Sequence, residues 1–213
     1  MRKTVAIKTD NQKRANGLNR LLYKCPRCGT EGKMEASGAT LSCSACGKSW
    51  YLNEQNLLEG NDGRTEFTEI SEWLRWERDI VRERIRNGTY YFEDTVHIES
   101  LPNSQRIRKQ GEGKLIQTPD RTTLTCTCGG EQMTLEKPAI SLESMHIEYD
   151  YLGNGDCVEI SGPNESFLCY LTKKDVLTQL SIATEEIYIY ANEKREQEIL
   201  AKSNNKENEN GSN

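Results

Sequence analysis

The chain contains 213 residues, of which 35% are hydrophobic and 29% are charged, and its formal net charge is −5. No segment approaches the roughly 20 apolar residues that a membrane-spanning helix needs, and the opening MRKTVAIKTDNQKR lacks the apolar core of a secretory signal. Eight cysteines in such a chain favour thiols and metal ligands over disulfides. We therefore expect a cytoplasmic protein with no transmembrane segment.

The net charge hides an asymmetry along the chain. Residues 1–60 carry ten Lys and Arg against five Asp and Glu, whereas residues 61–213 carry eighteen against twenty-eight. The basic segment 1–60 alone could bind an anion, but the acidic segment 61–213 opposes general binding to nucleic acid.

The first half of the chain divides into a lead-in, a cysteine-rich segment and a helix. Residues 1–20 have no apolar period and are expected to be flexible, and residues 21–53 hold two cysteine pairs between strand-like runs. LEGNDGRT, rich in turn-forming residues, then predicts a linker. A helix is expected at 66–88 because its apolar residues recur at spacings of three, four and seven: Ile70, Trp73, Leu74, Ile80, Val81 and Ile85.

From Tyr90 to Leu171 the apolar period changes to two, and turn signals such as Asn154-Gly155 separate the runs. The pattern predicts seven antiparallel strands, at 95–101, 113–118, 122–128, 131–136, 143–151, 156–161 and 166–171.

A final helix should begin at Lys173, since Thr172 and Asp175 have the spacing of a capping box. Its apolar face should cover the open sheet, with the residues Val176, Leu180, Ala183, Ile187 and Ala191. The expected class is α+β, and the β domain at 89–198 resembles the pleckstrin-homology-like superfold. The low-complexity tail at 199–213 is expected to be disordered.

The two cysteine pairs read CPRC at 25–28 and CSAC at 43–46. A C-x2-C turn directs both sulfurs to one point, and Gly29 and Gly47 after the pairs allow the positive φ that such turns need. Four thiolates form a closed tetrahedral shell, which predicts one structural Zn²⁺ per chain in a rubredoxin-like zinc ribbon. The ligands would be Cys25, Cys28, Cys43 and Cys46. An iron–sulfur cluster, a redox dithiol pair and disulfides are the alternatives.

The other cysteines, Cys126, Cys128, Cys157 and Cys169, alternate along predicted strands and are expected in the core as small hydrophobic residues, with a second metal site as the alternative. His97 and His146 fall on polar strand faces beside acidic residues. No G-x-S-x-G, G-x4-G-K or H-E-x-x-H motif occurs, so no catalytic residue is predicted.

The run LNRLLYKCPRCGTEGKMEASGATLSCSACGKSWYL resembles the cysteine-rich carboxy-terminal segment of the 1-acyl-glycerol-3-phosphate acyltransferase-like (lysophospholipid acyltransferase) proteins of Firmicutes. The resemblance continues through SEWLRWERDIVRERIRNGTYYFED, GEGKL, SLESMHIEYDY and KKDVLTQLSIATEEIYIY, and so covers most of residues 15–195. In that family a preceding catalytic domain carries an H-x4-D motif whose histidine acts as general base. Here Pro102 and Tyr151 stand five residues beyond the two histidines. The resemblance therefore implies a non-catalytic accessory module.

Several functions remain open. The first is an accessory module that docks on a protein, such as an acyltransferase catalytic domain, or on a membrane-associated enzyme. The second is nucleic-acid binding by charges and rings in the ribbon, namely Lys24, Arg27, Lys33, Lys48, Trp50 and Tyr51. The third is anionic-lipid binding, with peripheral membrane contact, by Arg106, Arg108 and Lys109 in the loop between the first two predicted strands. A residual acyltransferase activity is the fourth.

Overall fold

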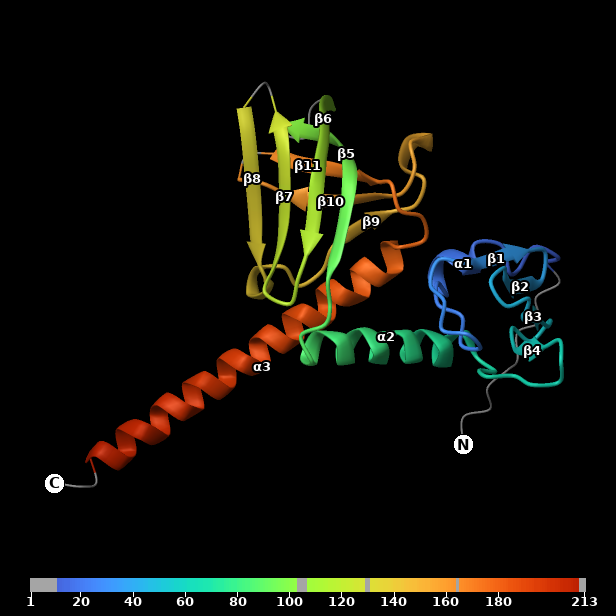
Figure 1. Ribbon diagram of the computed structural model, residues 1–213, viewed down its shortest axis with the longest axis horizontal. Coiled ribbons are helices and arrows are strands. Elements are labelled where there is room, and N and C mark those ends of the chain that lie inside the picture. Colours follow the sequence, from blue (N-terminus) through green and yellow to red (C-terminus); the bar gives the residue numbers. More distant parts are fainter. Residues whose placement is uncertain (1–10, 103–106, 129–130, 164, 211–213) are drawn as a thin grey trace. The chain divides into compact units, whose positions relative to one another are not determined.

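The computed structural model describes residues 11–102, 107–128, 131–163 and 165–210, and these fall into two compact units (Figure 1). Unit 1 comprises the described residues up to Ile80 together with Lys174–Gln179, and unit 2 comprises Val81–Lys173 and the residues from Leu180 onwards. The expected α+β class is confirmed, with a small cysteine-rich region, a curled seven-stranded antiparallel sheet and a C-terminal helix. None of the described helices combines the length and apolar character that a membrane crossing requires.

Unit 1 contains a short helix and a four-stranded antiparallel sheet in the order β1-β2-β3-β4. The elements are α1 (Leu18–Leu21), β1 (Met34–Ser37), β2 (Thr40–Cys43), β3 (Ser49–Leu52) and β4 (Leu58–Gly60). Strand β4 takes up the start of the expected linker LEGNDGRT, because Leu58 pairs with Leu52 and is almost fully buried. The turn that follows is held by the buried Lys48, whose Nζ donates to Asp62 and to Arg64 O.

Residues 11–20, assigned from the sequence to a flexible lead-in, instead pack onto the ribbon. Ala15 is fully buried and its amide donates to Gly38 O over 2.9 Å. The Gly38 amide in turn donates to Asn16 Oδ1 over 2.8 Å. These are contacts with a distant hairpin, and a local apolar period could not reveal them.

The core of unit 1 forms around Trp50 of β3 and Trp73 of helix α2 (Ile70–Arg86). Both indoles are fully buried, and their ring centroids lie 4.9 Å apart in an edge-to-face arrangement. Cys25 and Cys43 belong to the same cluster. All three tryptophans of the chain, the third being Trp76, lie in unit 1, so indole fluorescence reports on this unit alone.

Unit 2 holds the seven-stranded sheet, in the order β8-β7-β6-β5-β11-β10-β9 (Figure 1). The strands are β5 (Phe92–Pro102), β6 (Arg108–Gln117), β7 (Arg121–Cys128), β8 (Glu131–Pro138), β9 (His146–Glu148), β10 (Cys157–Ser161) and β11 (Glu165–Leu171). The short 3-10 turns η1 (Ala139–Ser141) and η2 (Tyr151–Gly153) flank β9. Two consecutive meanders, β5 to β8 and β9 to β11, are joined where β11 pairs with β5. All seven expected strands are therefore present.

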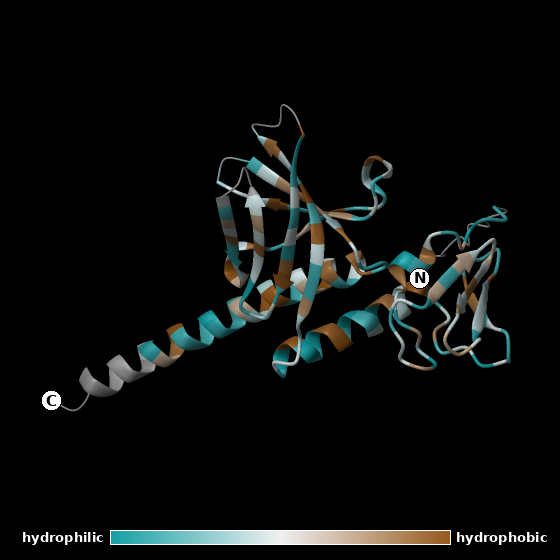
Figure 2. Cartoon of the chain, turned by 45° about the horizontal axis from the view of Figure 1, so that its top comes forward, coloured by the Kyte–Doolittle hydropathy of each residue, from teal (hydrophilic) through white to brown (hydrophobic). Residues whose placement is uncertain are grey.

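Helix α3 (Leu177–Asn210) belongs to unit 2 from Leu180 onwards, and the turns that follow Leu180 cover the sheet (Figure 1). Leu180, Ala183 and Ile187 of the expected apolar face are buried. A buried polar chain links helix and sheet: Tyr90 Oη donates to Gln117 Oε1 (2.7 Å), and Gln117 Nε2 donates to Thr184 Oγ1 (2.9 Å). Figure 2 shows mainly brown and white turns of α3 beneath the sheet and mainly teal turns further along.

The start and the end of α3 both differ from expectation. The capping box of Thr172 and Asp175 is wrong: the Thr172 and Lys173 amides and the Thr172 hydroxyl all donate to the buried carboxylate of Asp94. Asp175 has a φ of 56°, and the helix begins only at Leu177. At the other end α3 continues to Asn210, through a segment expected to be disordered that contains neither Pro nor Gly.

We expect Asp94→Ala to lower the free energy of unfolding of unit 2 by about 3 kcal/mol, because three donors of Thr172 and Lys173 lose their buried carboxylate acceptor. Urea unfolding followed by far-UV circular dichroism measures the change. The neighbouring Glu93→Ala is the control: Glu93 is partly exposed and pairs with Lys114, so its loss should cost much less than the loss of Asp94. Equal losses in both variants would contradict the role given to Asp94.

An acidic residue interrupts the apolar face of α2. Trp73, Val81 and Ile85 of the expected stripe are fully or almost fully buried, and so is Glu77, which lies one turn from each of its two nearest neighbours in that row. Burial raises the pKa of Glu77 from an ordinary 4.5 to about 8. The folded state therefore holds a proton that the unfolded chain releases. The stability supplied by this proton is complete below the unfolded pKa and is lost as the pH rises through the folded one.

We expect unit 1 of the wild-type protein to lose on the order of 3 kcal/mol of stability between about pH 5 and pH 8 through this group. Glu77→Gln, which mimics the protonated acid, should remove that slope. The measurement is urea unfolding followed by indole fluorescence at saturating zinc. Any pH dependence of metal binding is common to both proteins and cancels in the difference. Parallel pH profiles would show that Glu77 is ionised in the folded state.

Candidate metal centre

The two C-x2-C turns have the same backbone geometry. In the first, the Cys25 amide donates to Thr30 O (2.9 Å) and the Gly29 amide donates to Cys25 O (2.8 Å). In the second, the Cys43 amide donates to Lys48 O (2.8 Å) and the Gly47 amide donates to Cys43 O (2.9 Å). The glycines have φ values of 75° and 73°, in the left-handed region that L side chains avoid. The expected role of both glycines is confirmed.

The hairpin of β1 and β2 brings the second turn back to the first, and all four sulfurs then lie within 4.8 Å of one another. The sulfurs of Cys25 and Cys46 are 3.8 Å apart, as are those of Cys28 and Cys43. A metal–sulfur bond of about 2.3 Å in a tetrahedral shell requires a sulfur–sulfur edge of about 3.8 Å. The four cysteines are thus positioned to hold one metal ion.

The same distances bear on the alternatives. A disulfide needs a sulfur–sulfur bond of about 2.05 Å, and the four thiols are free and well beyond that separation. A multi-iron cluster places its own iron and sulfide core between the cysteines, which leaves no room for thiolates in mutual contact. A single ion with four sulfur ligands fits best.

The four thiols differ in their surroundings. Cys25 and Cys43 are buried, whereas Cys28 and Cys46 are exposed. The Thr30 hydroxyl lies 3.3 Å from the Cys28 sulfur, and this side chain together with the Thr30 amide lowers the pKa of Cys28 to about 6. Burial raises the pKa of Cys25, so its thiolate depends on a cation nearby. Thr30 was missed from the sequence; its place two residues after the second cysteine of the pair is the only signal.

The chemistry of such a centre is structural. With four protein ligands the shell is closed, and no position is left for water or substrate. Within the part of the chain that the structure describes, this is the one group of His, Cys, Asp and Glu side chains positioned to hold a metal ion.

Two of the three residues considered for anion binding lie in a strand, not in the expected loop. Arg106 lies outside the described residues, and Arg108 and Lys109 are exposed at the start of β6. Lys109 pairs in register with Glu99 of β5, a carboxylate on the adjacent strand. Anionic-lipid binding at this place stays a prediction.

The residues considered for nucleic-acid binding are mostly occupied. Trp50 is fully buried, the buried Lys48 ammonium pairs with the exposed Asp62, and Lys24 pairs with Glu31 over 2.9 Å. The exposed members of the set are Arg27, Lys33 and Tyr51. Tyr51 itself contacts Arg14, whose guanidinium donates to its hydroxyl over 2.7 Å.

The histidines and the remaining cysteines do not form a nucleophile with its base in the described structure. His97 is exposed, as expected, and His146 is exposed and pairs with Glu148 over 3.2 Å. Cys126, Cys157 and Cys169 are buried, which confirms their expected place, whereas the Cys128 side chain lies outside the described residues. Burial raises the pKa of Cys157 to about 12, so the thiol next to His146 in a small cavity stays protonated.

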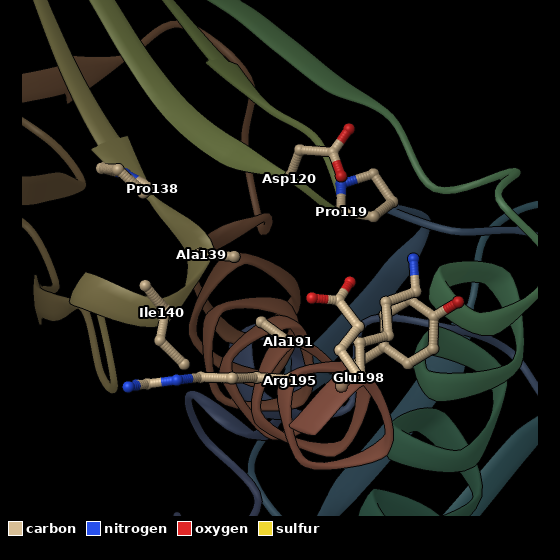
Figure 3. Close-up of a pocket in the computed structure, with 10 residues that line it drawn as sticks. Pro119, Asp120, Pro138, Ala139, Ile140, Ala191, Arg195 and Glu198 are labelled. Carbon is tan, nitrogen blue, oxygen red and sulfur yellow. The ribbon is translucent and has the colours of Figure 1, made fainter. Parts of the chain in front are cut away.

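A second concave region lies in unit 2 between α3, the β6–β7 turn and the segment after β8 (Figure 3). Pro119, Asp120 and Pro138–Ile140 lie across from Ala191, Arg195 and Glu198 of the helix, around a volume of about 240 Å³. Its lining contains no histidine, cysteine, serine or threonine. It therefore offers neither a hydroxyl or thiol nucleophile of serine, threonine or cysteine nor a soft metal ligand.

Comparison of the sequence with protein-family models and with curated proteins finds no match. The functional argument therefore rests on the four-cysteine centre itself.

Replacing either glycine of the turns should weaken the centre. A Cβ at Gly29 or Gly47 would meet nothing within 4 Å, so the cost of Gly47→Ala comes from the left-handed φ alone and should be about 1–2 kcal/mol. Gly47→Asn should cost less, since asparagine tolerates this conformation. Indole-fluorescence unfolding with bound metal measures both. A larger loss for Asn than for Ala would contradict the conformational explanation.

Proposed function

We propose that Cys25, Cys28, Cys43 and Cys46 bind one structural Zn²⁺ per chain. The observation that carries this proposal is the convergence of four sulfurs within 4.8 Å of one another, with two of the pairs 3.8 Å apart, the edge length of a tetrahedral thiolate shell. Zn²⁺ suits four thiolates in this geometry and has no redox chemistry of its own. When bound, it supplies an attractive charge at the meeting point of four negative sulfurs and performs no reaction.

The same proposal gives the chain a non-catalytic accessory role. The resemblance to the carboxy-terminal region of lysophospholipid acyltransferase-like proteins supports this role, as does the closed ligand shell. Neither histidine is followed five residues later by an aspartate, so the H-x4-D acyltransferase motif is missing. The zinc ribbon and the β domain would then serve to dock on a protein partner, for which an acyltransferase catalytic domain is the first choice.

Metal removal tests the first part. Structural zinc sites supply about 10–16 kcal/mol of apparent binding energy, more than the small core of unit 1 can replace. We expect a chelator to release one zinc per chain and to shift the emission of the three tryptophans, all in unit 1, to longer wavelength. The far-UV spectrum of the unit 2 sheet should persist.

Two variants sharpen this test. Cys43→Ser, at a buried ligand, should abolish stoichiometric zinc, whereas Cys126→Ala, at a buried cysteine of unit 2, should leave it unchanged. Iron in the purified protein, or emission that ignores the chelator, would reject the zinc centre.

The accessory role is tested by mixing. The full chain should bind a lysophospholipid acyltransferase catalytic domain that carries the H-x4-D motif, or change its rate of acyl transfer, while showing no transfer alone. Measured transfer by the chain alone, or neither binding nor an effect on rate in the mixture, would reject this role and leave the zinc centre standing.

A further inference from the structure

Helix α2 holds the backbone next to the first metal ligand. Lys24 directly precedes Cys25, and both of its peptide groups are bound by side chains of α2. The Lys24 amide donates to Glu77 Oε1 over 2.8 Å, and the Lys24 carbonyl accepts from Trp73 Nε1 over 3.0 Å. Trp73 and Glu77 lie one helical turn apart, and both are fully buried.

These contacts restrain the peptide bond that leads into the ligand. The Lys24 carbonyl and the Cys25 amide belong to one planar unit. Trp73 binds its oxygen, and Thr30 O accepts from its N–H over 2.9 Å. With both ends held, the plane cannot rotate, and the direction of the Cα–Cβ bond of Cys25 is restricted as a result.

The indole of Trp73 also reaches the second half of the ribbon. Its ring packs edge-on against Trp50 of β3, and β3 pairs with β2, the strand that ends at Cys43. The Trp73 side chain therefore contacts both halves of the ribbon. It packs on Trp50 of β3, next to the strand that carries Cys43, and it binds the backbone of Lys24, which precedes Cys25.

Burying the carboxyl group of Glu77 in this core has an unfavourable desolvation free energy. Its second oxygen, Oε2, is buried without a hydrogen-bond partner among the described residues, and burial raises its pKa to about 8. A leucine would continue the apolar face of α2 at no such cost. What a leucine cannot do is accept the Lys24 amide.

We propose that Trp73 and Glu77 are positioning residues of the metal centre, which act on Cys25 through the peptide of Lys24. The inference rests on the zinc centre proposed above. It adds two side chains of helix α2 to the residues on which metal binding depends. Groups that orient metal ligands in this way typically contribute about 10–100-fold to metal affinity.

The test is zinc competition against a chromophoric chelator, with the full chain and single variants. We expect about a tenfold loss of affinity in Glu77→Leu, which removes the acceptor, and in Trp73→Phe, which keeps an aromatic ring and removes the N–H. Glu77→Gln retains an acceptor and should stay within about twofold of wild type. Trp76→Phe, on the same helix with its ring on Phe67, is the matched control and should also bind normally.

The sign of the leucine effect separates positioning from packing. If Glu77 only filled space, an apolar replacement would be neutral or favourable, and the affinity of Glu77→Leu for zinc would equal or exceed that of wild type. That result would overturn the proposal, as would equal losses in Gln and Leu. The absorption spectrum of bound Co²⁺ gives a second readout, which should change in Trp73→Phe and Glu77→Leu and not in Trp76→Phe.

Misfolding is excluded by far-UV circular dichroism and by the stoichiometry at saturating zinc, and both must match wild type before an affinity is compared. Indole emission cannot serve here, because Trp73→Phe and Trp76→Phe each remove one of the three indoles. If Glu77→Leu fails this condition, Trp73→Phe decides the question alone. A wild-type chain that binds no zinc would reject the centre and the positioning role together. Zinc binding that is equally tight in wild type, Trp73→Phe and Glu77→Leu would reject only the positioning role.

Discussion

Four thiolates within 4.8 Å of one another repel unless a cation lies among them, and the rest of unit 1 depends on that condition. The core around Trp50 and Trp73 is small, and two of the ligands, Cys25 and Cys43, are part of it. Metal and core are therefore not independent. In the proposed centre the ion would hold the two cysteine turns together, and the packed indoles hold the strands and the helix in the positions that let the turns meet.

The cysteines of unit 1 are positioned as metal ligands, whereas the described cysteines of unit 2 are buried as small hydrophobic residues. The local backbone conformation determines which of these two roles a cysteine has. In unit 1 a turn between paired cysteines directs two sulfurs to the same side, beside the donors of Thr30. In unit 2 the cysteines occupy strands. Cys169 is surrounded by the interior of the sheet and Cys157 packs with Leu168 and Tyr170, so burial keeps both thiols protonated. The sequence already distinguishes these cases, because the cysteines of unit 1 form C-x2-C pairs whereas Cys157 and Cys169 stand singly in strand-like runs.

Much of the fold could be predicted because it follows from periodicity. The seven strands, the apolar face of α2 and the cysteine pairs are local patterns in the sequence. The rest depends on partners far along the chain. Thr172 has the spacing of a helix cap, but Asp94, remote in sequence, takes its donors. In the sequence Ala15 belongs to a polar lead-in, and only its hydrogen bond to Gly38 in the structure shows that it is packed. Glu77 interrupts the apolar stripe of α2 and accepts a hydrogen bond from the Lys24 amide. A helical pattern in the sequence could not reveal this contact.

The two cysteine turns share one hydrogen-bond pattern, so the effect of a substitution in one turn can be compared with its effect at the equivalent position of the other. Gly29 corresponds to Gly47, and Thr30 corresponds to Lys48, so each position in one half has a twin with the same backbone in the other. In the first half, the peptide groups of Lys24 before the first cysteine are hydrogen-bonded to helix α2; among the described contacts no such bond to a helix precedes Cys43. The same substitution made at twin positions thus has equal intrinsic cost, and any imbalance between the halves measures what the surroundings add.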